Sequence, residues 1–339
     1  MVKIGVIGAG LMGRQHATSL MGMRKLGRAQ VIGVAADDDD QARQLAKDTE
    51  STAFASVEEL LLAPGLDGVV IATPTDTHRK LAEQAIAAGK HIFVEKPISR
   101  TLEDATALVA TANEAGLTLQ VGHVIRYFDD YRRIGKAIAD NDLGRIAVAT
   151  FGRRCQQPDW APDRWHVTGS RSGGVTVDML IHDVDLIRWY FGEPSTVYAR
   201  TIGPDKWNGL DYVVATLTVP DGPICHLHAS WAEPSGFSQS AEVCGSLGML
   251  EYDSRMPPEL AYARHDTSAD APTALPAPPP GDADPFIRQM TDFVRAIETG
   301  EAPPSDGEWA LASLRIALAM VESSDRRDVI SLADIEVLV

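Results

Sequence analysis

The chain has 339 residues, enough for about two domains of ~100–200 residues each. It carries 31 Lys and Arg residues against 47 Asp and Glu residues, and a net charge of −16 makes nucleic acid a poor partner. The three cysteines form no CxxC pair and no even set, which argues against a disulfide framework and structural zinc. No apolar run approaches the ~20 residues of a bilayer span and no signal-peptide pattern is present, so we expect a cytoplasmic protein that does not bind membranes.

The first 120 residues alternate apolar runs with helical windows, which is the pattern of βαβ units. Continuous apolar runs are typical of a parallel sheet buried on both faces. Helix start signals occur at Ser56 and Thr101. We therefore predict a doubly wound parallel sheet in a first domain, residues 1–122. Its expected strands are Lys3–Ile7, Val31–Ala35, Gly68–Ala72, His91–Val94 and Leu117–Val121.

The remaining residues, 123–339, have a different pattern, with β-branched and aromatic runs that lack regular helices between them. They predict a second domain built on a largely antiparallel sheet. Its expected strands include Tyr212–Val219, Ile224–Trp231 and Met249–Tyr252, and its expected helices are Val177–Phe191, Pro285–Thr299 and Asp306–Ser323.

A glycine-rich turn, Gly8-Ala9-Gly10-Leu11-Met12-Gly13, follows the first strand and opens a helical window. In this context the GxGxxG spacing indicates a dinucleotide site. The glycines allow a tight turn, close approach of backbone amides to a pyrophosphate, and close helix–strand packing. We predict that Gly8, Gly10, Leu11, Met12 and Gly13 bind the cofactor. The alternative is a glycine-rich turn without a ligand.

Asp37 follows the second strand, where an acidic side chain accepts hydrogen bonds from the adenosine ribose. It favours NAD because a carboxylate repels the 2′-phosphate of NADP. The next three acids, Asp38–Asp40, are expected only to begin a helix. Arg43 nearby keeps NADP as an alternative.

Two polar segments follow later strands, Ala72-Thr73-Pro74 with His78, and Glu95-Lys96-Pro97. Ligands of a doubly wound sheet bind outside the carboxyl ends of its strands. A lysine at such an end is unusual unless a ligand uses it, although a surface lysine in an ordinary turn is the alternative.

Together with Gly173-Gly174 and the segment Asp178–Asp183, these motifs resemble the Gfo/Idh/MocA family, named for glucose–fructose oxidoreductase and inositol dehydrogenase. The resemblance implies an α/β protein with an N-terminal Rossmann domain and a C-terminal α/β domain with an open, mostly antiparallel sheet. It also implies a homodimer or homotetramer assembled through that sheet, and a frequently cis peptide bond before Pro97.

Asp178 and His182 are four residues apart in the predicted helix, a spacing that places both on one face. The resemblance matches them and Lys96 to the catalytic triad of inositol dehydrogenase members. His182 is then the general base, Lys96 polarises the reacting oxygen, and Asp178 binds a substrate hydroxyl. Without the resemblance, a helix-terminal acid and a core histidine would be the favoured explanation of the pair.

The same motifs and the resemblance indicate further residues that contact the cofactor or the substrate. Cofactor contacts are predicted for Thr73, Pro74, His78, Glu95, Lys96 and Arg126. Substrate contacts are predicted for Lys96, Arg126, Trp165, His166, Asp178 and His182. No metal is expected, because His226 and His228 are too few for a closed site.

The expected activity is an NAD-dependent hydride transfer between the nicotinamide and a secondary alcohol of a cyclic polyol or sugar, with inositol-like substrates first. One alternative is a sugar-nucleotide or glycoside 3-dehydrogenase or ketoreductase, with Arg153-Arg154 or Arg164 as an anion pocket. Another is a dinucleotide sensor without turnover.

Overall fold

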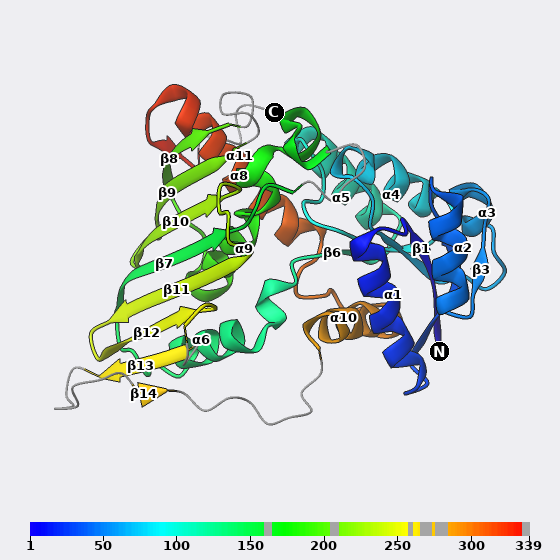
Figure 1. Cartoon of the computed structure of the whole chain (residues 1–339), viewed down its shortest axis with the longest axis horizontal. Helices are drawn as coiled ribbons and strands as arrows, with labels where there is room; N and C mark the ends of the chain where they lie inside the picture. Colours follow the sequence, from blue (N-terminus) through cyan, green and yellow to red (C-terminus); the bar gives the residue numbers. More distant parts are fainter. Residues whose placement is uncertain (159–164, 204–209, 257–259, 265–272, 275–283, 334–339) are drawn as a thin grey trace. The chain divides into compact units, whose positions relative to one another are not determined.

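The computed structural model describes residues 1–158, 165–203, 210–256, 260–264, 273–274 and 284–333. The chain forms two compact units (Figure 1). Unit 1 contains Met1–Tyr127 and Ala283–Ala312, and unit 2 contains Phe128–Asp282 and Ser313–Val339. The first break lies close to the boundary predicted at residue 122. The segment 283–312, which the sequence analysis placed in the second domain, instead belongs to unit 1.

Unit 1 is built on a six-stranded parallel sheet with the order β3-β2-β1-β4-β5-β6. The predicted doubly wound sheet is confirmed. Its strands are β1 (Val2–Ile7), β2 (Ala29–Ala35), β3 (Thr52–Ala53), β4 (Gly68–Ile71), β5 (His91–Val94) and β6 (Leu119–Val121). The sequence analysis missed β3, because its two residues are exposed and form no apolar run.

Helices flank this sheet, and two of them begin where the start signals predicted. The side chain of Ser56 accepts a hydrogen bond from the Glu59 amide, and Thr101 accepts one from the Asp104 amide. The helices are α1 (Leu11–Arg24), α2 (Asp39–Asp48), α3 (Val57–Leu61), α4 (His78–Ala87), α5 (Leu102–Glu114) and α10 (Pro285–Thr299), with 3-10 turns η1 (Thr75–Thr77) and η2 (Ile125–Tyr127).

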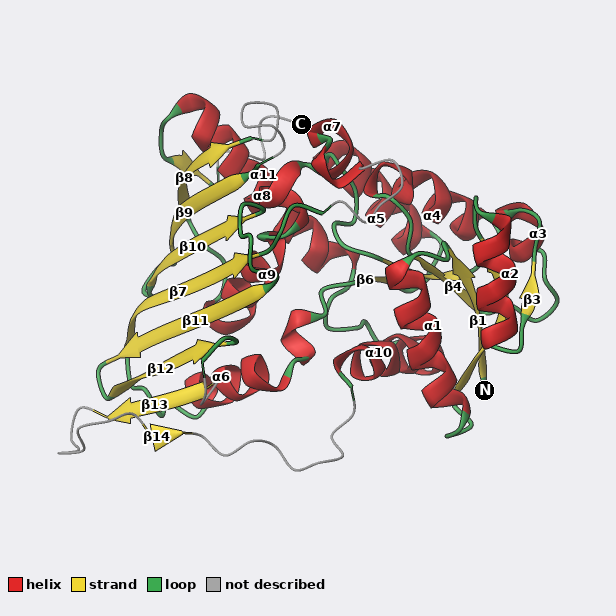
Figure 2. Cartoon of the chain, viewed as in Figure 1, coloured by secondary structure: helices red, strands yellow, loops and turns green. Residues whose placement is uncertain are grey.

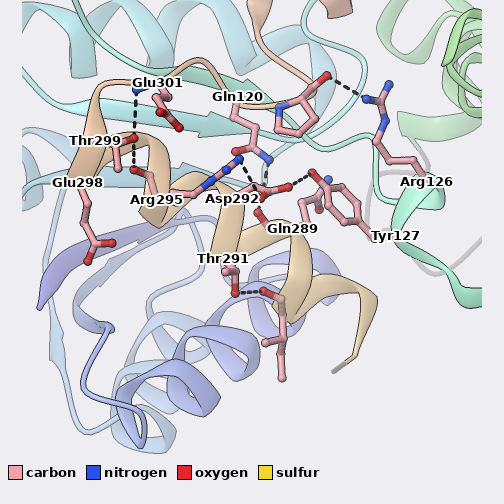
Figure 3. Close-up of polar contacts among 12 residues, drawn as sticks. Gln120, Arg126, Tyr127, Gln289, Thr291, Asp292, Arg295, Glu298, Thr299 and Glu301 are labelled. Carbon is pink, nitrogen blue, oxygen red and sulfur yellow. Dashed lines mark hydrogen bonds and ion pairs between the residues drawn. The ribbon is translucent and has the colours of Figure 1, made fainter. Parts of the chain in front are cut away.

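Helix α10 joins unit 1 because its apolar face completes the core beside α1. Met290 and Phe293 are fully buried in one cluster with Leu20 and Met23 of α1. Complete burial of each such side chain stabilises the fold by roughly 1.5–3 kcal/mol. A polar contact adds to this packing, since the Tyr127 hydroxyl donates to Asp292 of α10 at 2.8 Å (Figure 3). Sequence patterns do not show which sheet a distant helix will cover.

Unit 2 contains a nine-stranded sheet with the order β14-β13-β12-β11-β7-β10-β9-β8-β15. Only the β7–β10 pair is parallel within the described sheet, so the predicted, largely antiparallel architecture is confirmed. The strands are β7 (Ile146–Arg154), β8 (Thr196–Ile202), β9 (Tyr212–Thr218), β10 (Ile224–Ser230), β11 (Ser238–Gly245), β12 (Gly248–Asp253), β13 (Leu260–Arg264), β14 (Thr273–Ala274) and β15 (Ile330–Ser331).

Figure 2 shows α6, α8 and α9 along one face of this sheet. On the other face, alternate residues of β8, β9 and β10 are exposed, among them Tyr198, Val214 and Ile224 at 39–48%. The helical elements are α6 (Asp129–Ala139), η3 (Trp165–Val167), α7 (Gly169–Ser172), α8 (Gly174–Asp178), α9 (Ile181–Phe191) and α11 (Gly307–Arg326), the last with residues in both units. Among the described residues, no helix is both long and apolar enough to cross a membrane.

Candidate active site

The glycine turn leaves an open anion cradle at the end of β1. Gly8 has φ +100°, and a Cβ there would collide with the Ala72 carbonyl, while a Cβ at Gly13 would collide with the Gly8 carbonyl. At Gly10, by contrast, a Cβ would meet no atom within 4 Å. Helix α1 begins at Leu11, so the amides of Leu11, Met12 and Gly13 belong to its first turn and lack helical acceptors. These features fit a pyrophosphate at a helix N-terminus.

Asp37 lies two residues beyond β2, and its side chain is exposed. It forms no hydrogen bond or ion pair with the described residues. Its acidic neighbours differ, because Asp38 caps α2 through the Gln41 amide, and Asp39 and Asp40 pair with Arg43. Asp38–Asp40 thus begin a helix, as predicted.

The loops after β4 and β5 are linked by His78. This side chain is 1% exposed, with Nδ1 2.8 Å from the Pro97 carbonyl and Nε2 3.0 Å from the Thr73 carbonyl. Burial lowers the pKa of His78, and a neutral ring donates to only one of these carbonyls. The imidazole thus supports the loops that carry Thr73, Pro74 and Lys96. The Lys96–Pro97 peptide bond is cis, as the resemblance implied.

Glu95 points into the interior of unit 1. It is 7% exposed, and its Oε1 lies 2.6 Å from Nε2 of His16 on α1. Its Oε2 accepts a hydrogen bond from the Lys96 amide at 3.1 Å. Burial by itself would raise the pKa of Glu95, but the hydrogen bond and charge of His16, together with Lys96, lower it below its usual value. Sequence reasoning missed His16, whose only signal is its place three residues after the last glycine of the turn.

Arg126 is 6% exposed and belongs to unit 1. Its Nη1 donates to the Pro304 carbonyl at 2.9 Å, as Figure 3 shows, and its guanidinium carbon lies 5.0 Å from the centre of the Trp309 ring. The segment 283–312 therefore helps to fix this predicted ligand-binding side chain.

In unit 2 the predicted single helix over Val177–Phe191 is wrong. Asp178 is the last residue of α8, and His182 is the second residue of α9. The Leu180 amide bonds to the carbonyl of Val175, five residues earlier, so the helical register changes between the two residues. Asp178 and His182 therefore do not lie on one continuous helix face, although their i,i+4 spacing predicted it.

Two buried acids that the sequence analysis gave no part in the site anchor α8 and α9. Asp211 accepts a hydrogen bond from the Val175 amide at 2.7 Å, near the start of α8. Asp183, next to His182, receives two hydrogen bonds of 2.9 Å from the Arg153 guanidinium. Arg153 also donates to Gln239 and to Tyr131, and is 1% exposed. These partners are distant in sequence, so no local signal identifies them.

Arg153 is thus part of the unit 2 core, and its guanidinium cannot bind the anion for which the sequence proposed it. Arg164, another candidate for this anion, lies outside the described residues.

Asp178 is 9% exposed, and Trp165 and His166 are partly exposed with their ring centroids 3.8 Å apart in a stack. His226 and His228 lie on the same face of β10, as strand alternation requires. Among the described residues, no three His, Cys, Asp or Glu side chains are grouped as metal ligands.

Comparisons with known proteins agree with these features. Residues 2–123 match a family described as "Oxidoreductase family, NAD-binding Rossmann fold", and residues 131–251 match the GFO/IDH/MocA C-terminal domain. Inositol 2-dehydrogenase of Rhizobium meliloti (strain 1021) is 30% identical over 344 residues, with 98% of this chain and 99% of that protein covered. UDP-N-acetylglucosamine 3-dehydrogenase of Acidithiobacillus ferrooxidans is 33% identical over 234 residues, or 68% and 67% of the two chains. The crystal structure of a putative myo-inositol dehydrogenase from Sinorhizobium meliloti 1021 has a TM-score of 0.82 at 29% identity, with coverage of 98% and 100%.

Proposed function

The chain belongs to the GFO/IDH/MocA family of NAD(P)-dependent oxidoreductases, and we propose that it transfers a hydride between NAD and a secondary alcohol of a cyclic polyol or sugar. The family predicted from the motifs is confirmed. The observation that carries the proposal is the arrangement of three adjacent strand ends in unit 1. The glycine cradle follows β1, Thr73 follows β4 and Lys96 follows β5, and these strands are neighbours in one parallel sheet.

The choice of NAD over NADP rests on Asp37. Its exposed carboxylate is free to accept hydrogen bonds from the two ribose hydroxyls of NAD, and it repels a 2′-phosphate. Arg43, the basic residue that made NADP an alternative, is paired with Asp39 and Asp40.

The chemistry assigned to the side chains follows from the charge that develops during alcohol oxidation. NAD supplies the hydride acceptor. His182 removes the hydroxyl proton, since an imidazole is a suitable base near neutral pH. The Lys96 ammonium stabilises the developing alkoxide and polarises the ketone in the reverse direction. Asp178 accepts a hydrogen bond from a substrate hydroxyl.

Inositol-like substrates are the first choice for this chain. The inositol 2-dehydrogenase relative covers almost the entire chain. The stacked Trp165 and His166 rings offer an apolar face for the C–H surface of a cyclic polyol and a polar edge for its hydroxyls. Arg126, Lys96, Asp178 and His182 complete the proposed substrate contacts.

A sugar-nucleotide 3-dehydrogenase is the second candidate, favoured by the UDP-N-acetylglucosamine 3-dehydrogenase relative. Such a substrate carries a diphosphate, so UDP would compete with it without displacing NAD. The internal pairing of Arg153 with Asp183 removes one of the cations proposed for this diphosphate.

Assembly into a homodimer or homotetramer is also proposed, through the exposed face of the unit 2 sheet. Tyr198, Val214 and Ile224 expose apolar surface there. Contiguous apolar patches on folded proteins commonly mark interfaces. Light scattering should show an oligomer that Val214→Glu dissociates, and a monomeric parent protein would disprove this part of the proposal.

The activity is tested by incubating the protein and NAD with a panel of inositols, aldoses and UDP-sugars while nicotinamide reduction is recorded. Lys96→Met and His182→Ala should each lower kcat by about 10²–10⁴-fold, the usual contribution of such groups. Lys80→Met is a matched control at an exposed position. Full activity of either site variant would disprove the assigned mechanism, and an exclusive preference for UDP-sugars would select the second candidate.

A further inference from the structure

His16 and Glu95 form a buried pair behind the lysine loop. His16 is fully buried on α1, the helix that begins at the glycine turn, and its Nε2 lies 2.6 Å from Glu95. Glu95 is the residue before Lys96. The pair therefore connects the helix at the cofactor cradle with the loop that carries Lys96.

The chemistry of the two groups defines which of them donates the hydrogen bond. A carboxylate only accepts, so Nε2 of His16 donates to Oε1 of Glu95. Nδ1 of His16 has no hydrogen-bond partner among the described residues. The ring instead packs edge-on against Phe93 and Phe286, with centroids 4.9 and 5.8 Å away. His16 thus has one polar contact in an otherwise apolar environment, and that contact is with Glu95.

The second carboxylate oxygen of Glu95 contacts the backbone of Lys96. Oε2 accepts a hydrogen bond from the Lys96 amide at 3.1 Å. The carboxylate also lies against Gly122 at the end of β6, where an added Cβ would come within 2.8 Å of Oε2. Glu95 is therefore confined by α1, by its own loop and by the β6 end, and it has little freedom to turn away from the Lys96 backbone.

We propose that His16 is a positioning residue for Lys96 and acts through the Glu95 carboxylate. The inference rests on the proposed function, in which Lys96 acts on the substrate oxygen. When the donor is lost, Glu95 turns toward other partners and the Lys96 amide loses its carboxylate acceptor. A displacement of ~1 Å at a reacting group costs about 10²-fold in rate.

The test compares His16→Gln with His16→Asn. A glutamine amide nitrogen reaches the position of Nε2, whereas the shorter asparagine places its nitrogen near Nδ1 and leaves Glu95 without a donor. Met23→Ala is the control, because Met23 is also buried on α1 but lies in the apolar cluster with α10. We expect kcat to fall about 10–100-fold in His16→Asn and less than threefold in the other two variants. The KM for substrate and the Kd for NADH should stay within threefold of the parent values.

Amide hydrogen exchange over residues 93–100 supplies a readout that needs no substrate. The Lys96 amide should exchange about tenfold faster in His16→Asn than in the parent protein, and at the parental rate in His16→Gln and Met23→Ala. Parental exchange and kcat in a folded His16→Asn variant would overturn the proposal, as would equally fast exchange in Met23→Ala. If the parent oxidises no polyol or sugar, the proposed function fails, and the exchange rates alone decide whether His16 holds the Lys96 backbone.

Discussion

Two buried carboxylates, one in each unit, adjoin the side chains to which we assign chemistry, but their partners differ. Glu95 precedes Lys96 and pairs with the His16 imidazole. Asp183 follows His182 and pairs with the Arg153 guanidinium through two hydrogen bonds. Arg153 also donates hydrogen bonds to Gln239 and Tyr131, whereas Glu95 is the one hydrogen-bond partner of the His16 side chain among the described residues.

We assign the Arg153–Asp183 pair to the stability of unit 2 and the His16–Glu95 pair to the position of one loop. A guanidinium keeps its charge at any ordinary pH, so its removal leaves a charged acid in the core of unit 2. Burial raises the pKa of Asp183, and the Arg153 guanidinium opposes that effect. The imidazole of His16 offers Glu95 a single donor atom, Nε2. Its loss leaves the β5 loop with backbone hydrogen bonds of its own, such as the one from the Glu95 amide to the Ile71 carbonyl.

The largest expected effect follows from breaking the unit 2 pair. Arg153→Met should lower the free energy of unfolding by about 3–5 kcal/mol, because it leaves a buried charge without its partner. The double variant Arg153→Met with Asp183→Leu removes both charges and should recover most of that loss. Urea denaturation measures the free energy of unfolding of both variants. A loss below ~1 kcal/mol in the single variant would remove Asp183 from the role of anchor for α9.

A smaller effect is expected for Glu95→Gln in unit 1. The amide oxygen can still accept from His16, but the new NH₂ group has no acceptor, so a loss of about 1–3 kcal/mol is expected in the same denaturation experiment. Glu103→Gln, at an exposed position in the first turn of α5, is the control and should change stability by less than ~0.5 kcal/mol. If Glu95→Gln destabilises as strongly as Arg153→Met, the contrast between the two pairs is wrong.

The pH dependence sharpens the same contrast. Because the folded-state pKa of Glu95 is lowered, its carboxylate stabilises the fold above its unfolded value of 4.5. That contribution disappears as the pH falls through the lower folded-state pKa. The stability gap between the parent and Glu95→Gln should therefore be largest at neutral pH and shrink below pH 4.5. Urea denaturation at several pH values tests this, and a constant gap would contradict ionisation of Glu95 in the fold.

The smallest effect on stability is expected at Asp37, an exposed carboxylate without a hydrogen bond or ion pair to the residues that the structure describes. Asp37→Ser should change the free energy of unfolding by less than ~0.5 kcal/mol. It should still shift the NAD to NADP preference about tenfold toward NADP, equivalent to ~1.4 kcal/mol, because a charge repulsion is lost. Asp40→Ser is the control, and kcat/KM with each cofactor is the measurement. An unchanged preference would remove Asp37 from the cofactor site.

Local patterns predicted most of unit 1. Each apolar strand and the GxGxxG turn depend on residues adjacent in sequence, and the parallel order then places Gly8, Thr73 and Lys96 at neighbouring strand ends. The predictions for unit 1 were wrong where packing between residues distant in sequence determines the structure. The assignment of residues 283–312 to unit 1 depends on the match between α10 and the apolar face of α1, and β3 has no apolar pattern of its own.

The candidate site divides in the same way. Its polar residues were proposed from the resemblance to family motifs, and from the unusual place of Lys96 between a buried strand and a proline. The break between α8 and α9 was not recognisable, because an i,i+4 spacing does not show whether the backbone register continues. Nor was the burial of Arg153, because the residues next to it in sequence give no indication of a partner 30 residues away.

The alternation of strands and helices, the cofactor turn and the family could be predicted from the sequence, because each depends on neighbouring residues or on a short motif. The partners of Glu95 and Asp183 could not, because a buried charge is compensated by whichever distant group the fold brings within hydrogen-bond reach. It also showed that the carboxylates of this acidic chain differ in kind. Asp37 is exposed, Asp38–Asp40 begin a helix, and Glu95 and Asp183 are buried beside the proposed catalytic side chains.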